Sequence, residues 1–188
     1  MKNIIIVIIL CAINQISLAQ NNIPSIKDHT TLNYICKLHG QTRTLSLKKQ
    51  IVSDTLVFHL ETRGVKSSIK MTPEAVKRGT ELSFNQGENT PVIVLKPLET
   101  FFIISKSSYQ DLLKNNQFVY NNTTYVLDKS EKTDPVIIDG IALSTLHVVA
   151  QIDNTEMWIL QNPDFPLLCK VTNNPLGINF TLTDMVSE

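Results

Sequence analysis

Short apolar runs separated by turn-forming residues are the feature that most restricts the fold of this chain. Residues 136–184 contain such runs at 141–152, 156–161, 167–172 and 178–183. Asn, Asp, Pro or Gly residues bound the runs, which are rich in β-branched and apolar residues. Because this pattern is typical of strands joined by tight turns, residues 136–184 are predicted to form a strand meander.

A second series of alternating runs lies nearer the N-terminus, at residues 31–39, 42–48, 55–62 and 65–71. In the first of these runs every second residue is apolar, which is the pattern of a strand with one buried face. The connections between the runs are too short for helical crossovers, so the four strands are expected to be antiparallel.

Other segments carry helix signals. Thr72 can cap a helix that begins at Pro73, and Gly79 suits its end. Residues 107–115 have apolar side chains at helical spacing, and residues 118–127 suit a short hairpin. The chain is therefore predicted to be mainly β, of the α+β class, with two or three short helices.

The first nineteen residues have the composition of a secretory leader. Lys2 provides a short basic segment, residues 4–12 are apolar, and Ser17 and Ala19 precede a suitable cleavage point before Gln20. The alternative is a membrane anchor, but the apolar run ends well short of the roughly eighteen residues that a span requires.

We therefore expect a signal peptide at residues 1–19 and one mature β-rich domain at residues 20–188, which is periplasmic or secreted. No stable membrane span is expected after signal cleavage. Seventeen basic and seventeen acidic residues give a formal net charge of zero, so the composition does not suggest a nucleic-acid partner. The hydrophobic content of 43% argues against disorder.

The expected mature domain contains two cysteines, Cys36 and Cys169. In an oxidising compartment, an even number of cysteines favours a disulfide, which would join the first mature strand to the last meander. Alternatively, both can be small buried apolar residues, because each lies in a strand-like run. Neither has the spacing of a metal or redox motif.

Motifs of catalysis are absent, since there is no GxSxG, no glycine-rich phosphate loop and no HExxH. Asp139-Gly140 resembles part of an aspartic-protease motif, but its single copy would require a dimer, and Asp-Gly is a common hairpin turn. His39 and His59 could meet across strands as a zinc pair, yet no further ligand is spaced to complete the site. No catalytic residue, metal or cofactor is therefore predicted.

Aromatic residues are the candidates for a ligand site. Trp158, the single tryptophan, can pack in the core or form a wall of an apolar pocket. Rings that point inward from a sheet covered by short helices can line a cavity or fill it. The ligand-pocket candidates are Phe58, Phe84, Phe101, Tyr109, Trp158 and Phe180.

The end of the chain resembles a pattern of periplasmic lipoprotein-carrier-like domains. The residues that carry it are Glu156-Met-Trp-Ile-Leu-Gln161, Phe165-Pro166-Leu167, Asn173-Asn174-Pro-Leu-Gly177 and residues 178–183. In that superfamily a strand ending in Trp-Ile-Asp leads to a Leu-Pro pair and two further strands, and here Gln161 or Asp164 stands for the aspartate. The resemblance implies a strongly curved antiparallel sheet, or unclosed barrel, whose helix-capped concave face binds acyl chains or other apolar ligands.

These observations favour an exported, non-enzymatic protein that binds an apolar small molecule, a lipid or a lipidated partner on a curved sheet. Two alternatives stay open. The chain could be a protein-interaction or inhibitor module that uses a sheet edge or a polar loop at residues 85–90 or 128–135. It could also be a hydrolase, for example a dimeric aspartic protease around Asp139.

Overall fold

The computed structural model describes residues 22–85, 90–130 and 134–187, so the expected signal peptide at residues 1–19 lies outside the described residues. The described chain is mainly β, as predicted, and its largest element is one sheet of eleven strands. Two short helices accompany the sheet in these residues, α2 (Pro73–Arg78) and α3 (Lys106–Asn115). Neither of them has the length and apolar composition needed to cross a bilayer.

The N-terminal strands form the predicted antiparallel meander. Each strand pairs with the next one along the chain, in the order β1 (Thr31–Leu38), β2 (Gln41–Val52), β3 (Thr55–Thr62) and β4 (Val65–Met71). β2 continues past its predicted end at Lys48 because Val52 still pairs with Thr55. Ser53 and Asp54 make the tight turn between these two residues, with φ of 46° and 66°.

The C-terminal strands form a second antiparallel meander, also as predicted. Its members are β12 (Thr145–Ala150), β13 (Glu156–Leu160), β14 (Leu168–Thr172) and β15 (Ile178–Val186). The predicted hairpin of β8 (Gln117–Tyr120) and β9 (Thr123–Leu127) extends this meander, because β9 pairs with β12. Asn121 and Asn122 form the hairpin turn at φ of 48° and 58°, which asparagine tolerates.

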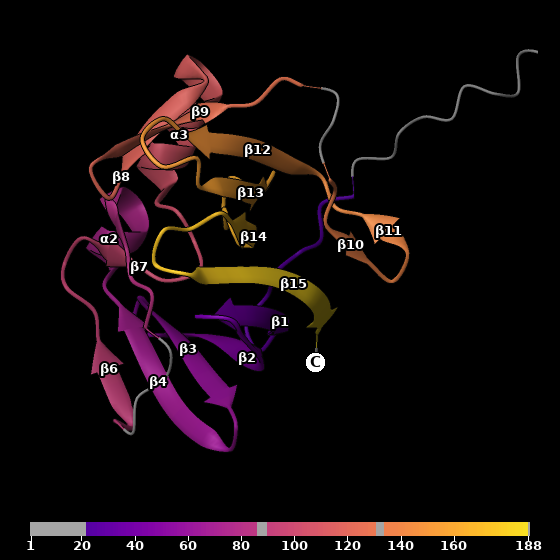
Figure 1. The fold of residues 1–188 in the computed structure, drawn as a ribbon. Coiled ribbons are helices and arrows are strands. Elements are labelled where there is room, and N and C mark those ends of the chain that lie inside the picture. The colour runs from indigo at the N-terminus through magenta and orange to yellow at the C-terminus, as the bar shows by residue number, and fades with distance from the viewer. Residues whose placement is uncertain (1–21, 86–89, 131–133, 188) are drawn as a thin grey trace, which may run out of the picture.

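Pairing between β1 and β15 joins the two meanders into one sheet. Thr31 lies opposite Val186 and Leu38 lies opposite Ile178. Figure 1 shows the indigo β1 and the yellow β15 side by side, although they come from opposite ends of the described chain. The parallel strand β6 (Val92–Val94) adds to β4, so the order is β6-β4-β3-β2-β1-β15-β14-β13-β12-β9-β8 and the sheet is open.

Two small sheets lie outside the main one. β5 (Glu81–Leu82) pairs in parallel with β7 (Glu99–Thr100), and β10 (Ile137–Ile138) pairs with β11 (Ile141–Ala142) as a hairpin. Asp139 and Gly140 form the hairpin turn with φ of 51° and 77°. The interpretation of Asp139-Gly140 as a turn is therefore confirmed.

Both helices lie at the predicted places. Thr72 Oγ1 accepts a hydrogen bond from Ala75 N at 3.1 Å, and Pro73 opens α2. Asn116 ends α3 in the left-handed conformation. Gly79 does not have the positive φ of a helix-terminating glycine, since its φ is −55°. A Cβ there would lie 2.6 Å from Ala75 O, so close packing requires this glycine.

Aromatic rings fill the middle of the inner face, which we define as the face of the sheet that bears Tyr34, Phe58 and Phe180. The Phe102 ring is the centre of the cluster: its centroid lies 4.5 Å from that of Tyr34, 4.7 Å from that of Phe101 and 4.3 Å from that of Phe180. Phe102 has φ of 55°, which is unusual for a large side chain. The packing of its ring offsets the cost of this conformation.

A buried hydrogen bond links β1 to β14 across β15. Tyr34 OH donates to Leu168 O at 3.1 Å, and both residues are buried. Removing the hydroxyl would leave the buried carbonyl without this donor, which costs about 1–3 kcal/mol. The bond therefore holds the two meanders together on the inner face in addition to the strand pairing.

We expect Tyr34→Phe to lower the free energy of unfolding by about 1–2 kcal/mol, measured by urea denaturation followed by tryptophan fluorescence. Tyr125→Phe is the matched control, because Tyr125 is also buried and its hydroxyl has no hydrogen-bond partner among the described residues. The control should change the free energy by less than about 0.5 kcal/mol. Equal losses in the two variants would contradict the role given to the Tyr34 hydroxyl.

Candidate binding pocket

Two cationic side chains of β2 point toward the inner face of the sheet. Every second residue of the strand from Arg43 to Lys49 points inward, so that Arg43 and Lys49 flank the buried Leu45 and Leu47. Charged side chains are rare at such positions unless they are paired. The partners of these two cations are therefore informative.

Lys49 has an acidic partner within the chain. Its Nζ donates to Asp28 Oδ1 at 2.6 Å and lies 5.6 Å from the centre of the Phe165 ring. The hydrogen bond from Lys49 lowers the pKa of Asp28 from its usual value. Lys49 is 7% exposed, and this ion pair compensates for its burial.

Arg43 is half-buried and has no comparable partner. Its Nη2 donates to Gln41 Oε1 at 3.1 Å, while its Nε is buried and has no hydrogen-bond acceptor. In the described part of the chain, no carboxylate lies within ion-pair distance of the guanidinium. A buried donor without an acceptor is destabilising, so this group is suited to an acceptor from outside the chain.

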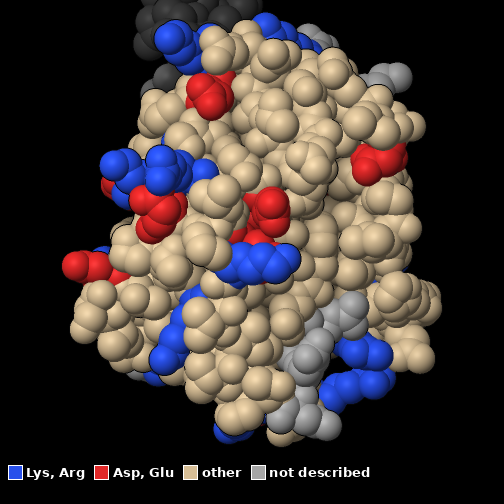
Figure 2. Space-filling view, turned by 90° about the vertical axis from the view of Figure 1, so that its left-hand side faces the viewer, with Lys and Arg blue, Asp and Glu red and all other residues tan. Residues whose placement is uncertain are grey.

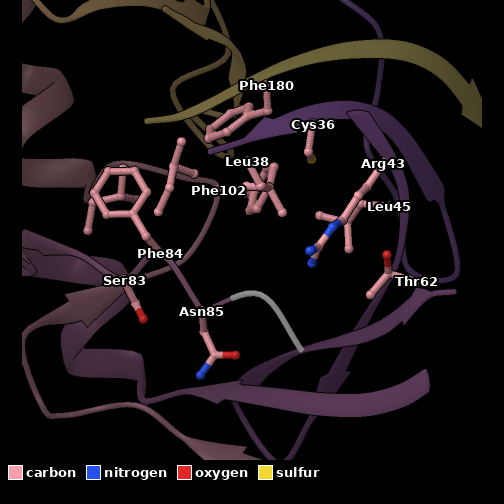
Figure 3. Close-up of a pocket in the computed structure, with 12 residues that line it drawn as sticks. Cys36, Leu38, Arg43, Leu45, Thr62, Ser83, Phe84, Asn85, Phe102 and Phe180 are labelled. Carbon is pink, nitrogen blue, oxygen red and sulfur yellow. The ribbon is translucent and has the colours of Figure 1, made fainter. Parts of the chain in front are cut away.

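Arg43 lies beside a mostly apolar pocket between β1, β2, β15 and the segment that follows β5. We call it the apolar pocket. Its apolar lining residues are Cys36, Leu38, Leu45, Leu82, Phe84, Phe102, Ile178 and Phe180. Its polar lining residues are Arg43, Thr62, Ser83 and Asn85. Figure 3 shows the Arg43 guanidinium directed into the pocket, with Phe84 and Asn85 on the opposite side.

The apolar pocket is a narrow slot. The empty space between its side chains is about 470 Å³ when its open mouth is included, but only about 30 Å³ is wide enough for a water molecule. About 10–15 Å³ of such space is enough for one water, so the slot has room for roughly two waters. An alkyl ligand therefore requires side chains around the slot to move.

Two of the six predicted ligand-pocket residues line the apolar pocket, and the other four do not. Phe84 and Phe180 line the apolar pocket, as expected of such residues. Phe58 and Phe101 are 0% exposed, their ring centroids are 6.2 Å apart, and Tyr109 is 3% exposed on α3. These three side chains are packed in the core, and they line neither the apolar pocket nor the other four best-formed pockets among the described residues.

Trp158 lies on the opposite face of the sheet from Phe180. It pairs with Lys170, which pairs with Thr181, whereas the neighbouring Met157 shares the inner face with Phe180. The Trp158 ring stacks on His147 at 4.3 Å between centroids, and Lys170 Nζ lies 4.3 Å from the ring. Trp158 therefore packs on the outer face, in keeping with its interpretation as a packing residue, and it does not line the apolar pocket with Phe84 and Phe180.

The charges around Trp158 are paired within the chain. His147 Nε2 lies 2.8 Å from Glu156 Oε2, and Lys170 Nζ lies 2.8 Å from Asp134 Oδ2. His147 Nδ1 is 3.1 Å from Asp128 Oδ2, although without hydrogen-bond geometry. Hydrogen bonds from Ser130 lower the pKa of Asp128, and the Lys170 ammonium lowers that of Asp134. Each of these charged side chains therefore has a partner among the described residues.

Cys36 and Cys169 are free, buried thiols, so the disulfide interpretation is wrong and the alternative of small buried apolar residues holds. β15 lies between their strands, β1 and β14. Strands two positions apart in a sheet are about 10 Å apart, whereas a disulfide needs Cα atoms within about 7 Å. Burial raises the pKa of Cys36 to about 11 and also raises that of Cys169.

The hydrolase and metal hypotheses gain no support from the structure. Asp139 is an exposed residue of a hairpin turn. His39 lies in the turn after β1, while His59 lies within β3 and bonds to Gln50 and Ser68. Within residues 22–85, 90–130 and 134–187, no three His, Cys, Asp or Glu side chains are grouped to hold a metal ion.

A larger groove, with about 720 Å³ wide enough for a water molecule against about 30 Å³ in the apolar pocket, lies between the end of β2, α2 and residues 162–165. It contains charges of both signs, including Lys49, Lys106 and Asp164. Lys49 is paired with Asp28, and Lys106 Nζ lies 3.9 Å from Asp164 Oδ1. Lys77 and Asp54, which also line the groove, are exposed, so none of its described residues has a buried polar side-chain atom without a partner, unlike Arg43 of the apolar pocket.

The surfaces predicted for protein interaction are only partly described. Residues 86–89 and 131–133 of the two polar loops lie outside the described residues. The edge strand β6 exposes Val92 and Val94 to 45% and 69%. Figure 2 shows one face of the molecule, on which charged side chains occur in small groups separated by uncharged surface. Charge therefore does not mark an interaction surface on this face.

Arg43, Leu38 and Leu45 line the pocket but were not among the predicted pocket residues. A signal was available for Arg43, because it occupies an inward position of an alternating run that continues through Leu45 and Leu47. No sequence signal shows that Ile178 and Phe180 line the same pocket as Arg43, because β15 lies beside β1 only through long-range strand pairing.

Comparison with known proteins gives little guidance. No family model matches the chain, and no curated protein matches it. Among solved structures, the chain is similar to the crystal structure of MucB, with 10% sequence identity and a TM-score of 0.36. The match covers 93% of this chain and 56% of that chain, so this chain spans about half of the length of that structure. Similarity at this level assigns neither a fold family nor a function.

The cysteine assignment predicts the alkylation pattern of the protein. At pH 8 without reductant, iodoacetamide should leave Cys36 and Cys169 unmodified in the folded protein, because both are buried and a pKa of about 11 leaves Cys36 protonated. In guanidinium chloride, still without reductant, both should be alkylated, as measured by peptide mass spectrometry. If both resist alkylation until a reductant is added, the two cysteines form a disulfide.

Proposed function

We propose that the protein is an exported, non-enzymatic binding protein that holds an apolar ligand in the apolar pocket. The observation that carries this proposal is the lining of the pocket, which is mostly apolar with a few polar groups. Small-molecule sites commonly combine these two features.

The shape of the pocket favours an unbranched alkyl chain over a bulky ring system. The slot is narrow, and a single alkyl chain is the thinnest apolar group that a ligand can present. Phe84 is half-buried and lies outside any helix or strand, so its ring can turn aside without breaking strand pairing. Each CH₂ group that then becomes buried contributes about 0.8 kcal/mol.

The remaining parts of the proposal come from the sequence. The leader-like residues 1–19 support export to the periplasm or secretion. The resemblance of residues 156–183 to lipoprotein-carrier-like domains supports a lipid, or the acyl chain of a lipidated partner, as the ligand. The proposal includes a sheet that curves around this ligand, as in that superfamily, and no enzymatic activity.

A large side chain that fills the slot should weaken ligand binding. Thr62 lines the apolar pocket, so we expect Thr62→Trp to weaken the binding of hexadecanol, a neutral sixteen-carbon probe, by at least about tenfold. Equilibrium binding of isotope-labelled hexadecanol to the purified protein measures the effect. Mass spectrometry of an organic extract of the same protein should show a co-purified apolar molecule.

Thr44→Trp is the matched control, because Thr44 lies next to Arg43 on β2 but is exposed and does not line the apolar pocket. This variant should bind hexadecanol as the unmodified protein does. Urea denaturation shows whether both variants remain folded. Absence of a co-purified apolar molecule, together with no binding of any alkyl probe, would refute the proposed function.

A further inference from the structure

Among the described residues that line the apolar pocket, Arg43 is the charged one. Its guanidinium is directed into a space whose walls are mostly apolar, and its Nε is buried without an acceptor. A cation in such surroundings is strongly stabilised by an anion that reaches it, because water screens the attraction only partly. The pocket therefore discriminates between ligands by charge as well as by shape.

We infer that the ligand is a single-chain amphiphile with an acidic head, whose alkyl chain enters the slot and whose carboxylate or phosphate binds the Arg43 guanidinium. This inference rests on the proposed function, since it assigns the head group of a ligand that binds in the same pocket. The shared chemistry is an anionic oxygen group at the end of one alkyl chain.

The position of Arg43 fixes the orientation of this ligand. Arg43 is half-buried, so a head group beside it keeps contact with water, while Phe102 and Phe180 are 6% and 4% exposed in the apolar wall. The alkyl chain accordingly runs toward the two rings and the acidic head stays near the mouth. Thr62 and Asn85 also line the pocket, and the Thr62 hydroxyl, which donates to Thr44 O, can accept a hydrogen bond but has no second proton to donate.

The comparison with Lys49 supports a role for Arg43 in ligand binding. Both cations project from the same face of β2, but Asp28 from the N-terminal segment neutralises only Lys49. A purely structural arginine at this position would be expected to have a similar carboxylate, because a buried donor without an acceptor is destabilising. A ligand anion supplies the acceptor that the described chain does not.

The test compares palmitate with hexadecanol, which have the same chain length and differ in the head group. At pH 8 we expect palmitate to bind the purified protein about ten- to a hundredfold more tightly than hexadecanol. Arg43→Gln should remove this advantage and change hexadecanol binding by less than about threefold. Arg43→Lys, which keeps the charge but loses the planar guanidinium, should restore part of the advantage.

Arg63→Gln is the matched control, because Arg63 is an exposed arginine in the turn after β3 and does not line the apolar pocket. It should leave the affinities for both probes unchanged. Urea denaturation of each variant separates a loss of binding from a loss of folding. If Arg43→Gln does not fold, the ratio of the palmitate and hexadecanol affinities of the unmodified protein and of Arg43→Lys still tests the inference.

A third probe, palmitoyl lysophosphatidate, distinguishes the two sources of the acidic head. Tighter binding of palmitate supports a free fatty acid, and tighter binding of lysophosphatidate supports a phosphate-headed lipid, in both cases only if Arg43→Gln removes the preference. If neither palmitate nor lysophosphatidate binds more tightly than hexadecanol, the inference is overturned but the proposed function is left intact. If no probe binds, the proposed function itself fails.

Discussion

The pairing of β1 with β15 is the constraint on which the rest of the structure depends. It turns two local meanders into one open sheet and brings residues from the two ends of the described chain into contact. Cys36 and Phe180 lie opposite each other only because of this register, and both line the apolar pocket. The same pairing places β15 between the two cysteines and keeps them as free thiols.

Aromatic packing decides how much of the inner face remains open. Phe58, Phe101 and Phe102 fill the middle of this face, so a broad cavity lined by all the inward rings does not form. The narrow apolar pocket remains beside the cluster, where Phe84 is half-buried. Because interiors are packed as densely as organic crystals, the rings that stabilise the sheet also restrict the size of a ligand.

Much of the local structure could be predicted, but less of the candidate site. Alternation identified β1 to β4, capping residues identified α2, and Asp139-Gly140 identified a hairpin turn, because each of these signals acts over a few residues. Alternation could not place Trp158, since residues 157–160 are all buried and hide which face each side chain occupies. Of the predicted pocket residues, Phe84 and Phe180 line the apolar pocket, and Arg43 was missed.

The sequence by itself determined the mainly β class, the two meanders and the short helices, because turn chemistry and side-chain alternation are local properties of the chain. Tertiary structure alone decided the order of the strands, the separation of Cys36 from Cys169 and the meeting of Arg43 with Phe180 at one pocket. These features depend on contacts between residues far apart in the chain, and periodicity carries no information about which distant strands become neighbours.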